Sequence, residues 1–422
     1  LVRYALFLKI SKKTKRKPLE LGHLKIPKPE MERFNFVHDI ATKLSLVYSP
    51  IVDNSEIGQN ILNQLSLDKR VIALENHMIM KGNSGSRFEI KNLVMWFLWA
   101  SNEFGQDVAQ KNLDLFLDSE KIPVINALWV LGLELENPIQ IGDWCTITPI
   151  HLMPISPESE HYQKQDFQFS VHAAPKPLAA LTSIVYIKKA ELEPKLGSDQ
   201  NKEFWETSNR LQEIALILNS IENISCIPYF QTSYFLPNMP LGVFSGSSGG
   251  SPIHDIYGFH RTKVTETLIN EMNIIYSAFQ KLDPGDKARI SLSLSRFSQA
   301  KRRIQMTDKI LDLCIALEML LLNDNQNHEQ LSLSFRLRGS WLIGKNQESR
   351  KLTYNLLKDL YNQRSQVAHN GMFDKKIKIE TLIETFPKYV QLTSEIIRSL
   401  IILPNPNWND LLIGTTDHIT DK

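Results

Sequence analysis

The chain has 422 residues, of which 42% are hydrophobic and 22% are charged, so it can bury a substantial core in two or three domains and is not a disordered chain. Its formal net charge of +2 is too small to indicate a nucleic-acid partner for the chain as a whole. The three cysteines are widely spaced and form no metal-binding pattern, so we expect a reducing, cytoplasmic compartment.

The N-terminal residues are not expected to form a signal peptide or a membrane span. Residues 1–10 are apolar but short, and the basic run 12–17 follows them, which reverses the order of a signal peptide. The segment 93–100 is the nearest to a span, but it is too short, so we expect a core helix and no membrane partner. The run 12–17 is interpreted as a solvated arm or, alternatively, as an RNA-binding arm. The start at Leu1 leaves a fragment of a longer chain as one interpretation.

The first 245 residues show sequence patterns of both helices and strands. Apolar spacing predicts helices over 32–46, 92–104, 110–117 and 201–220, whereas β-branched and aromatic runs predict strands over 124–131, 144–148, 183–188 and 226–236. We therefore predict a mixed α/β sensor or regulatory region over 1–245, with 1–120 and 121–245 as two subdomains in one reading. No motif indicates what such a region would sense.

A Gly/Ser-rich stretch follows at 245–252 and is expected to belong to a mobile loop over 246–261. A phosphate-binding loop is the competing interpretation, but the stretch lacks the Gly-Lys-Ser/Thr ending and no helix start follows it at once. His254, Asp255 and His260 lie just beyond it without a third metal ligand at a sensible spacing. We therefore expect no metal site and no cofactor.

The rest of the chain is predicted to be helical, which gives an α+β fold class with a C-terminal all-α bundle over 262–402 and a tail over 403–422. Helices are predicted over 262–282, 287–303, 329–343, 348–368 and 375–400, with another that Thr307 caps and that carries the apolar stripe 310–321. Pro404 and Pro406 should end the bundle. Lys and Arg exceed Asp and Glu in this part, which suits RNA but is equally common in solvated bundles.

The most specific chemical pattern is an arginine followed, after four to six residues, by a histidine. The chain contains it four times, as Arg16 with His23, Arg33 with His38, Arg70 with His77, and Arg364 with His369. Only the last pair lies late in a predicted amphipathic helix, with a polar residue, Ser365, directly after the arginine and Gly371 as a helix end. Arg364 should lie at the margin of the apolar seam, with His369 on the exposed rim.

This pair has the parts that metal-free RNA cleavage needs. A ribose 2′-hydroxyl attacks the adjacent phosphorus, one group moves a proton, and a cation stabilises the phosphoryl oxygens. An imidazole and a bidentate guanidinium can supply both functions, and two copies across a two-fold axis would form a composite pocket. The alternative is that Arg364 pairs within the bundle and His369 is an ordinary helix-end residue.

Residues from about 287 to 400 resemble a HEPN domain, specifically the Apea-like branch. The likeness lies in the segments 311–321, 331–344 and 360–371, and the family hallmark of an arginine, a polar residue and a later histidine is met by Arg364, Ser365 and His369. Two departures are the less apolar residues after the arginine and Asn370, which separates the histidine from Gly371.

The resemblance implies a homodimeric, metal-independent endoribonuclease that acts in anti-phage defence or toxin-like growth arrest. His369 would transfer protons, Arg364 would bind the phosphate, and Ser365 would order the pair. A phage-derived trigger or a regulatory partner would control it. Because some members have lost catalysis, a non-catalytic dimeric scaffold or RNA-binding module is the alternative.

Supporting residues are also predicted. Glu318 and Asn370 would position the pair, although a structural salt bridge from Glu318 to Arg336 or Arg338 is the competing interpretation. Further RNA contacts are expected from Arg302, Arg303, Arg336 and Arg338.

Overall fold

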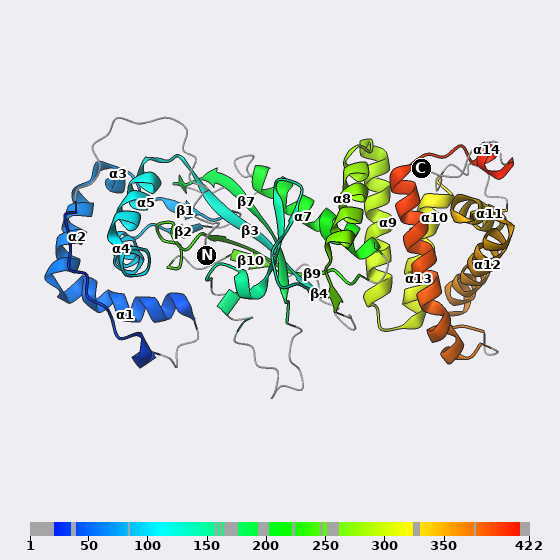
Figure 1. Ribbon diagram of the computed structural model, residues 1–422, viewed down its shortest axis with the longest axis horizontal. Coiled ribbons are helices and arrows are strands. Elements are labelled where there is room, and N and C mark those ends of the chain that lie inside the picture. Colours follow the sequence, from blue (N-terminus) through cyan, green and yellow to red (C-terminus); the bar gives the residue numbers. More distant parts are fainter. Residues whose placement is uncertain are drawn as a thin grey trace. The chain divides into compact units, whose positions relative to one another are not determined.

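The computed structural model describes residues 21–34, 39–82, 85–156, 159–160, 163, 176–192, 202–221, 224–244, 248–250, 261–323, 330–374 and 377–413. The chain divides into two compact units that alternate along the sequence. Unit 1 comprises Leu1–Trp129, Leu135–Leu211 and Tyr229–Pro252, and unit 2 comprises Val130–Glu134, Gln212–Pro228 and Ile253–Lys422. The predicted α+β class is confirmed, because strands lie in the N-terminal half and the C-terminal part is helical (Figure 1).

The helices of unit 1 include α1 (Ile40–Asn54), α2 (Glu56–Leu67), α3 (Lys69–Ile72), α4 (Ile90–Phe104) and α5 (Gln106–Asp118). The first three begin where a small polar side chain caps them, namely Asp39, Ser55 and Asp68. The helix predicted over 32–46 is wrong in its start: Met31–Phe34 forms a 3-10 turn, and α1 begins only after Asp39, whose carboxylate accepts from the Thr42 N–H at 2.7 Å. The segment 93–100 is buried throughout within α4, which confirms the predicted core helix.

A six-stranded sheet forms the centre of unit 1, in the order β10-β9-β3-β7-β6-β5. Its strands are β3 (Lys121–Leu131), β5 (Ile139–Ile141), β6 (Cys145–Pro149), β7 (Ala179–Lys188), β9 (Ile227–Phe235) and β10 (Ser248–Gly250). Strand β3 is buried from Ile122 to Leu131, as expected for an apolar run covered on both faces. A smaller sheet joins β2 (Gly85–Arg87), β1 (Met78–Met80) and β8 (Ala190–Glu191).

The helix α7 (Lys202–Ser220) starts in unit 1 and ends in unit 2. In unit 1 its Ser208 hydroxyl lies 2.8 Å from the Asn126 amide of β3, and the Gln231 amide donates to Asn126 at 3.0 Å. The buried Asn126 is thus satisfied by its neighbours.

Unit 2 is a helical bundle. Its helices are α8 (Glu266–Gln280), α9 (Pro284–Arg302), α10 (Met306–Leu321), α11 (Leu331–Ile343), α12 (Gln347–Asn370), α13 (Ile379–Ile402) and α14 (Trp408–Ile413). A short parallel pair of β4 (Leu133–Glu134) and β11 (Thr262–Lys263) precedes α8, so residues 262–263 are strand and not the predicted helix. The predicted cap at Thr307 is wrong, because α10 begins at Met306 and Gln305 occupies the N-cap position.

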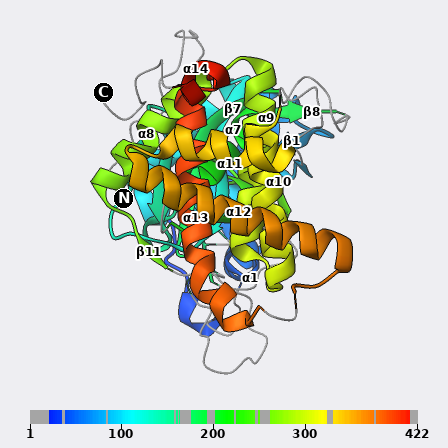
Figure 2. The same cartoon turned by 90° about the vertical axis from the view of Figure 1, so that its right-hand side faces the viewer.

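Helix α10 carries the core of the bundle, with Leu313, Leu317 and Leu321 buried completely. Helices α11 and α12 pack closely because Gly339 has no side chain: a Cβ there would lie 2.5 Å from Leu357 Cδ1. Figure 2 shows α11 and α12 side by side in front of α10 and α13.

The last helix corrects the predicted tail over 403–422. Helix α13 ends before Pro404, as predicted, but α14 then packs against α11. Trp408 of α14 is buried, and the Arg338 guanidinium lies 4.9 Å from the centre of its ring. Within the part of the chain that the structure describes, no helix has both the length and the apolar character needed to cross a membrane.

Candidate active site on helix α12

Helix α12 positions the predicted Arg–His pair and is closed at both ends by its own sequence. Asn346 and Ser349 form a reciprocal capping box at its start. Gly371 adopts a φ of 70° and its N–H donates to the Val367 carbonyl at 2.9 Å, which confirms the predicted glycine end.

Arg364 lies at the edge of the α10–α12 seam. Its Nη2 atom lies 3.2 Å from Glu318 Oε2, and the two side chains are 30% and 20% exposed. The guanidinium also lies 5.9 Å from the centre of the Tyr361 ring. Its Nε atom is buried and has no hydrogen-bond partner among the described residues. Arg364 is therefore held in place by one carboxylate, and its side chain stays partly exposed at the edge of the seam.

Glu318 is the partner that fixes Arg364, in place of the alternative bridge to Arg336 or Arg338. Burial raises the pKa of the Glu318 carboxyl, and the charge and hydrogen bond of Arg364 only partly oppose this. Cys314 lies beside the pair, fully buried, and burial raises the pKa of its thiol. Arg364 thus offsets only part of the loss of hydration that the Glu318 carboxylate undergoes on burial.

His369 lies in the exposed last turn of α12, apart from this ion pair. It lies five positions after Arg364, which places the two residues about 140° apart around the helix at about 100° per residue. Ser365 is half-buried between them. Asn370, predicted to position the pair, donates instead to Gln366 Oε1 at 2.8 Å. One copy of α12 therefore offers the arginine and the histidine on different sides.

The four arginines predicted to bind RNA have different surroundings. Arg338 donates to the Leu321 carbonyl at 2.6 Å and covers Trp408, so it joins α10, α11 and α14. Arg303 donates to the buried Asp312 at 3.2 Å, and Arg302 is half-buried in the last turn of α9. Only Arg336 stacks beside α12, 5.1 Å from the centre of the Tyr354 ring.

The other Arg–His spacings have structural surroundings where they are described. Arg70 is held by Asp68, Asp114 and Asp118 at 2.7, 3.1 and 3.2 Å in unit 1. Arg33 pairs with Glu30 on an exposed turn. The partners Arg16 and His38, the basic run 12–17, and His254, Asp255 and His260 lie outside the described residues. Among the residues with described positions, no group of three or more His, Cys, Asp or Glu could hold a metal ion.

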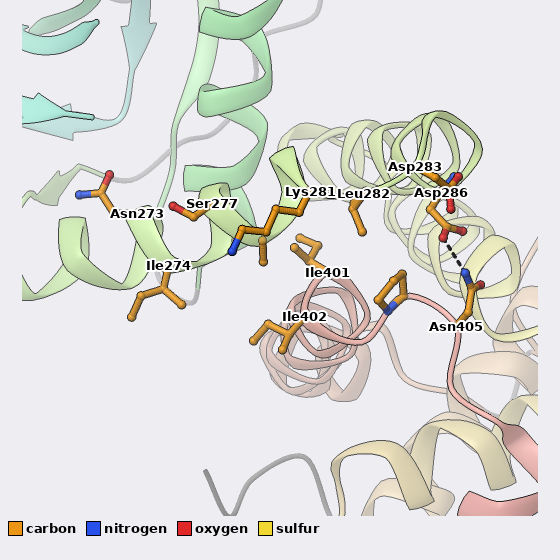
Figure 3. A pocket seen from close by; sticks show the side chains of 12 residues that line it. Asn273, Ile274, Ser277, Lys281, Leu282, Asp283, Asp286, Ile401, Ile402 and Asn405 are labelled. Atoms are coloured by element: carbon orange, nitrogen blue, oxygen red, sulfur yellow. Dashed lines mark hydrogen bonds between the residues drawn. The ribbon is translucent and has the colours of Figure 1, made fainter. Parts of the chain in front are cut away.

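Sequence reasoning missed a groove at another place on unit 2. It has a volume of about 890 Å³ and lies where the C-terminal end of α8, the start of α9 and the end of α13 meet (Figure 3). Asn405 there donates to Asp286, and Ile274 and Ile402 are exposed. None of the predicted site residues lines this groove.

Comparisons with protein-family models, with curated proteins and with solved structures found no match. The resemblance to HEPN domains therefore stays a prediction that rests on the residues quoted above.

Proposed function

We propose that unit 2 is a metal-independent endoribonuclease whose site is built on α12. The observation that carries the proposal is that α12 holds both the partly exposed Arg364 and the exposed His369. Glu318 of α10 fixes Arg364 in place. A positioned and partly exposed guanidinium can bind a phosphodiester, since its planar fork matches two phosphoryl oxygens. An imidazole on an exposed turn can exchange protons with a bound strand.

The reaction proceeds by intramolecular attack. His369 accepts the proton of the ribose 2′-hydroxyl, the 2′-oxygen bonds to phosphorus, and the bond from phosphorus to the 5′-oxygen breaks. Arg364 stabilises the charge on the phosphoryl oxygens in the transition state. The departing 5′-oxygen takes a proton from water, and His369 releases to solvent the proton that it accepted, so the products are a 2′,3′-cyclic phosphate and a 5′-hydroxyl. Ser365, directly after Arg364, orders the pair.

Two copies of the chain complete the site in this proposal. The arginine and histidine of one copy diverge around α12, so a second α12 across a two-fold axis would bring Arg364 of one copy toward His369 of the other. Exposed apolar side chains follow His369 along the chain, in the turn after α12 and in the first turns of α13, and would be buried by such a pairing: Met372, Ile379 and Ile383. In this view, one isolated copy is inactive.

A non-catalytic scaffold or RNA-binding module is the second candidate. The same ion pair favours it, because a carboxylate already occupies one side of the Arg364 guanidinium. In a scaffold, Glu318 and Arg364 would only lock α10 against α12, and His369 could be replaced without consequence.

The deciding experiment incubates the full-length protein with total tRNA and mRNA in EDTA, beside Arg364→Ala and His369→Ala. Matched controls are Arg398→Ala, which breaks another ion pair of the same bundle, and His151→Ala, which removes an exposed histidine in unit 1. Cleavage by the parent and both controls, with cyclic-phosphate ends, and not by the two site variants, is the expected result. Cleavage that survives both site substitutions contradicts the site, and no cleavage by a folded dimer favours the scaffold.

The biological role follows from the resemblance and is proposed with it. An RNA-cleaving unit of this kind would act in anti-phage defence or growth arrest, and it must be restrained until needed. Unit 1 would be the sensor or regulatory part that releases it when a phage-derived trigger or a partner binds.

A further inference from the structure

Helices α11 and α12 concentrate positive charge that the whole chain does not have. Between Leu331 and Gly371 there are seven Lys and Arg against two Asp and Glu, which gives a net charge of +5, whereas the entire chain has +2. The pair of helices lies side by side at the front of unit 2 in Figure 2. A polyanion would therefore be drawn to this face more than to the chain on average.

Aromatic rings and arginines alternate along this face. The Arg350 guanidinium lies 3.8 Å from the centre of the Trp341 ring, and the Arg336 guanidinium lies 5.1 Å from that of Tyr354. Arg364 and Tyr361 form the third contact, and Tyr361 also lies 5.2 Å from Phe335. On α12 the stacked positions are 350, 354, 361 and 364, which fall on one stripe because they are spaced by four, seven and three residues.

The stacked side chains are half-buried, so each is held by the bundle while part of it stays exposed to solvent. Arg350 and Arg336 are fixed further by backbone carbonyls, the first by Gly344 at 3.0 Å and the second by Ser332 at 2.8 Å. Guanidinium planes and aromatic rings held in this way are the surfaces on which unstacked bases pile up. A duplex keeps its bases inside and cannot use them.

We propose that this stripe, from Trp341 and Arg350 through Arg336 and Tyr354 to Tyr361 and Arg364, guides single-stranded RNA into the cleavage site. That the bound RNA is then cleaved rests on the proposed function, whereas its binding to the stripe rests on the stacking geometry alone. Lys351 and Lys358 are exposed on the neighbouring row of α12, where they meet the phosphates. From Arg350 to Arg364 the helix rises about 21 Å, enough for about six nucleotides at about 3.4 Å each.

The test measures binding apart from cleavage. The full chain is titrated against a fluorescent oligouridine of about twelve nucleotides, twice the length of the stripe, in which every ribose is 2′-O-methylated and so cannot be cut. Trp341→Ala and Tyr354→Ala should each weaken binding about 5- to 150-fold, the range for loss of one stacked base. Trp205→Ala, which removes a half-exposed tryptophan in unit 1, is the matched control and should bind like the parent.

Two further arms guard against a variant that fails to fold. Lys351→Gln with Lys358→Gln changes only exposed side chains, and it should lower the slope of log Kd against log salt by about 1.4. Tyr354→Phe keeps the ring and should keep the affinity. The proposal is overturned if the folded stripe variants bind like the parent, if a blunt RNA duplex binds as tightly as the single strand, or if the parent binds neither. Stripe-dependent binding without any cleavage of natural RNA would leave this inference standing and remove the nuclease.

Discussion

Replacing Glu318 by Gln should separate activity from stability. At 3.2 Å and an effective dielectric constant of about 20, the ion pair with Arg364 has about 5 kcal/mol of gross attraction. Burial nevertheless raises the pKa of Glu318, so the loss of hydration outweighs what Arg364 returns. We therefore expect the free energy of unfolding of Glu318→Gln to lie within about 1 kcal/mol of the parent at neutral pH, or above it.

The pH dependence has a definite sign. Because the folded pKa of Glu318 lies above the ordinary value of about 4.3, the folded protein holds this proton longer than the unfolded chain does. The contribution of Glu318 to stability is therefore complete below that ordinary value and is lost as pH rises through the folded pKa. Glu318→Gln lacks this loss, so its stability relative to the parent should improve as pH rises from about 4 to 7.

Hydrogen exchange of the α10 and α12 amides at two pH values measures this difference in stability between Glu318→Gln and the parent within unit 2 alone. Glu271→Gln is the matched control, since it alters the ion pair with Arg398, where the carboxylate is more exposed. Cleavage by Glu318→Gln should fall about 100-fold, because an unanchored guanidinium is misplaced by about 1 Å. Destabilisation by more than about 2 kcal/mol at neutral pH would refute the argument that loss of hydration outweighs the pair.

Three further substitutions test features of the fold. Gly371→Ala should lower the free energy of unfolding by about 1 kcal/mol in urea, because its φ of 70° strains any Cβ; an unchanged midpoint contradicts this. Gly339→Leu should reduce stability by about 1–3 kcal/mol or more and separate α11 from α12, since even a Cβ there meets Leu357 at 2.5 Å; a parent-like melting curve would be inconsistent with that packing. Lys189→Met removes a buried ammonium that donates to the Phe116 and Leu117 carbonyls. Burial lowers the Lys189 pKa from 10.5 to about 8, so the free energy of unfolding of the parent rises as the pH rises between these two values. The difference in stability between Lys189→Met and the parent should therefore widen over this range, and a difference independent of pH would contradict the argument.

The sequence predicted elements best where one periodic stripe was long and buried. The stripe through Leu313 and Leu317 and the run 93–100 both became core helices, because burial of a continuous apolar face decides such segments. The end of α12 at Gly371 was equally predictable, since few other residues adopt that conformation without strain.

The wrong or open predictions share a physical cause: several nearby polar residues could serve as the helix cap or the ion-pair partner, and the sequence alone does not decide among them. Thr307 is a good cap by composition, yet α10 begins one residue before it. Glu318 had Arg336, Arg338 and Arg364 as possible partners, and only packing of α10 on α12 selects the last. The stack of Arg350 on Trp341 joins two helices across Gly344, and spacing along one helix cannot show it.

Because the two units alternate along the chain, the helical bundle cannot be isolated intact as one continuous C-terminal fragment. A cut in the stretch 246–261 would leave behind β4, the partner of β11, and the end of α7. Lys301, whose pKa burial lowers to about 8, donates to the carbonyls of Asn219 and Ile224, and the Ser394 hydroxyl donates to that of Ser220. A fragment starting at Thr262 would bury these donors without their acceptors. The bundle can therefore be transferred to another protein only together with residues 130–134 and 212–228 of unit 2.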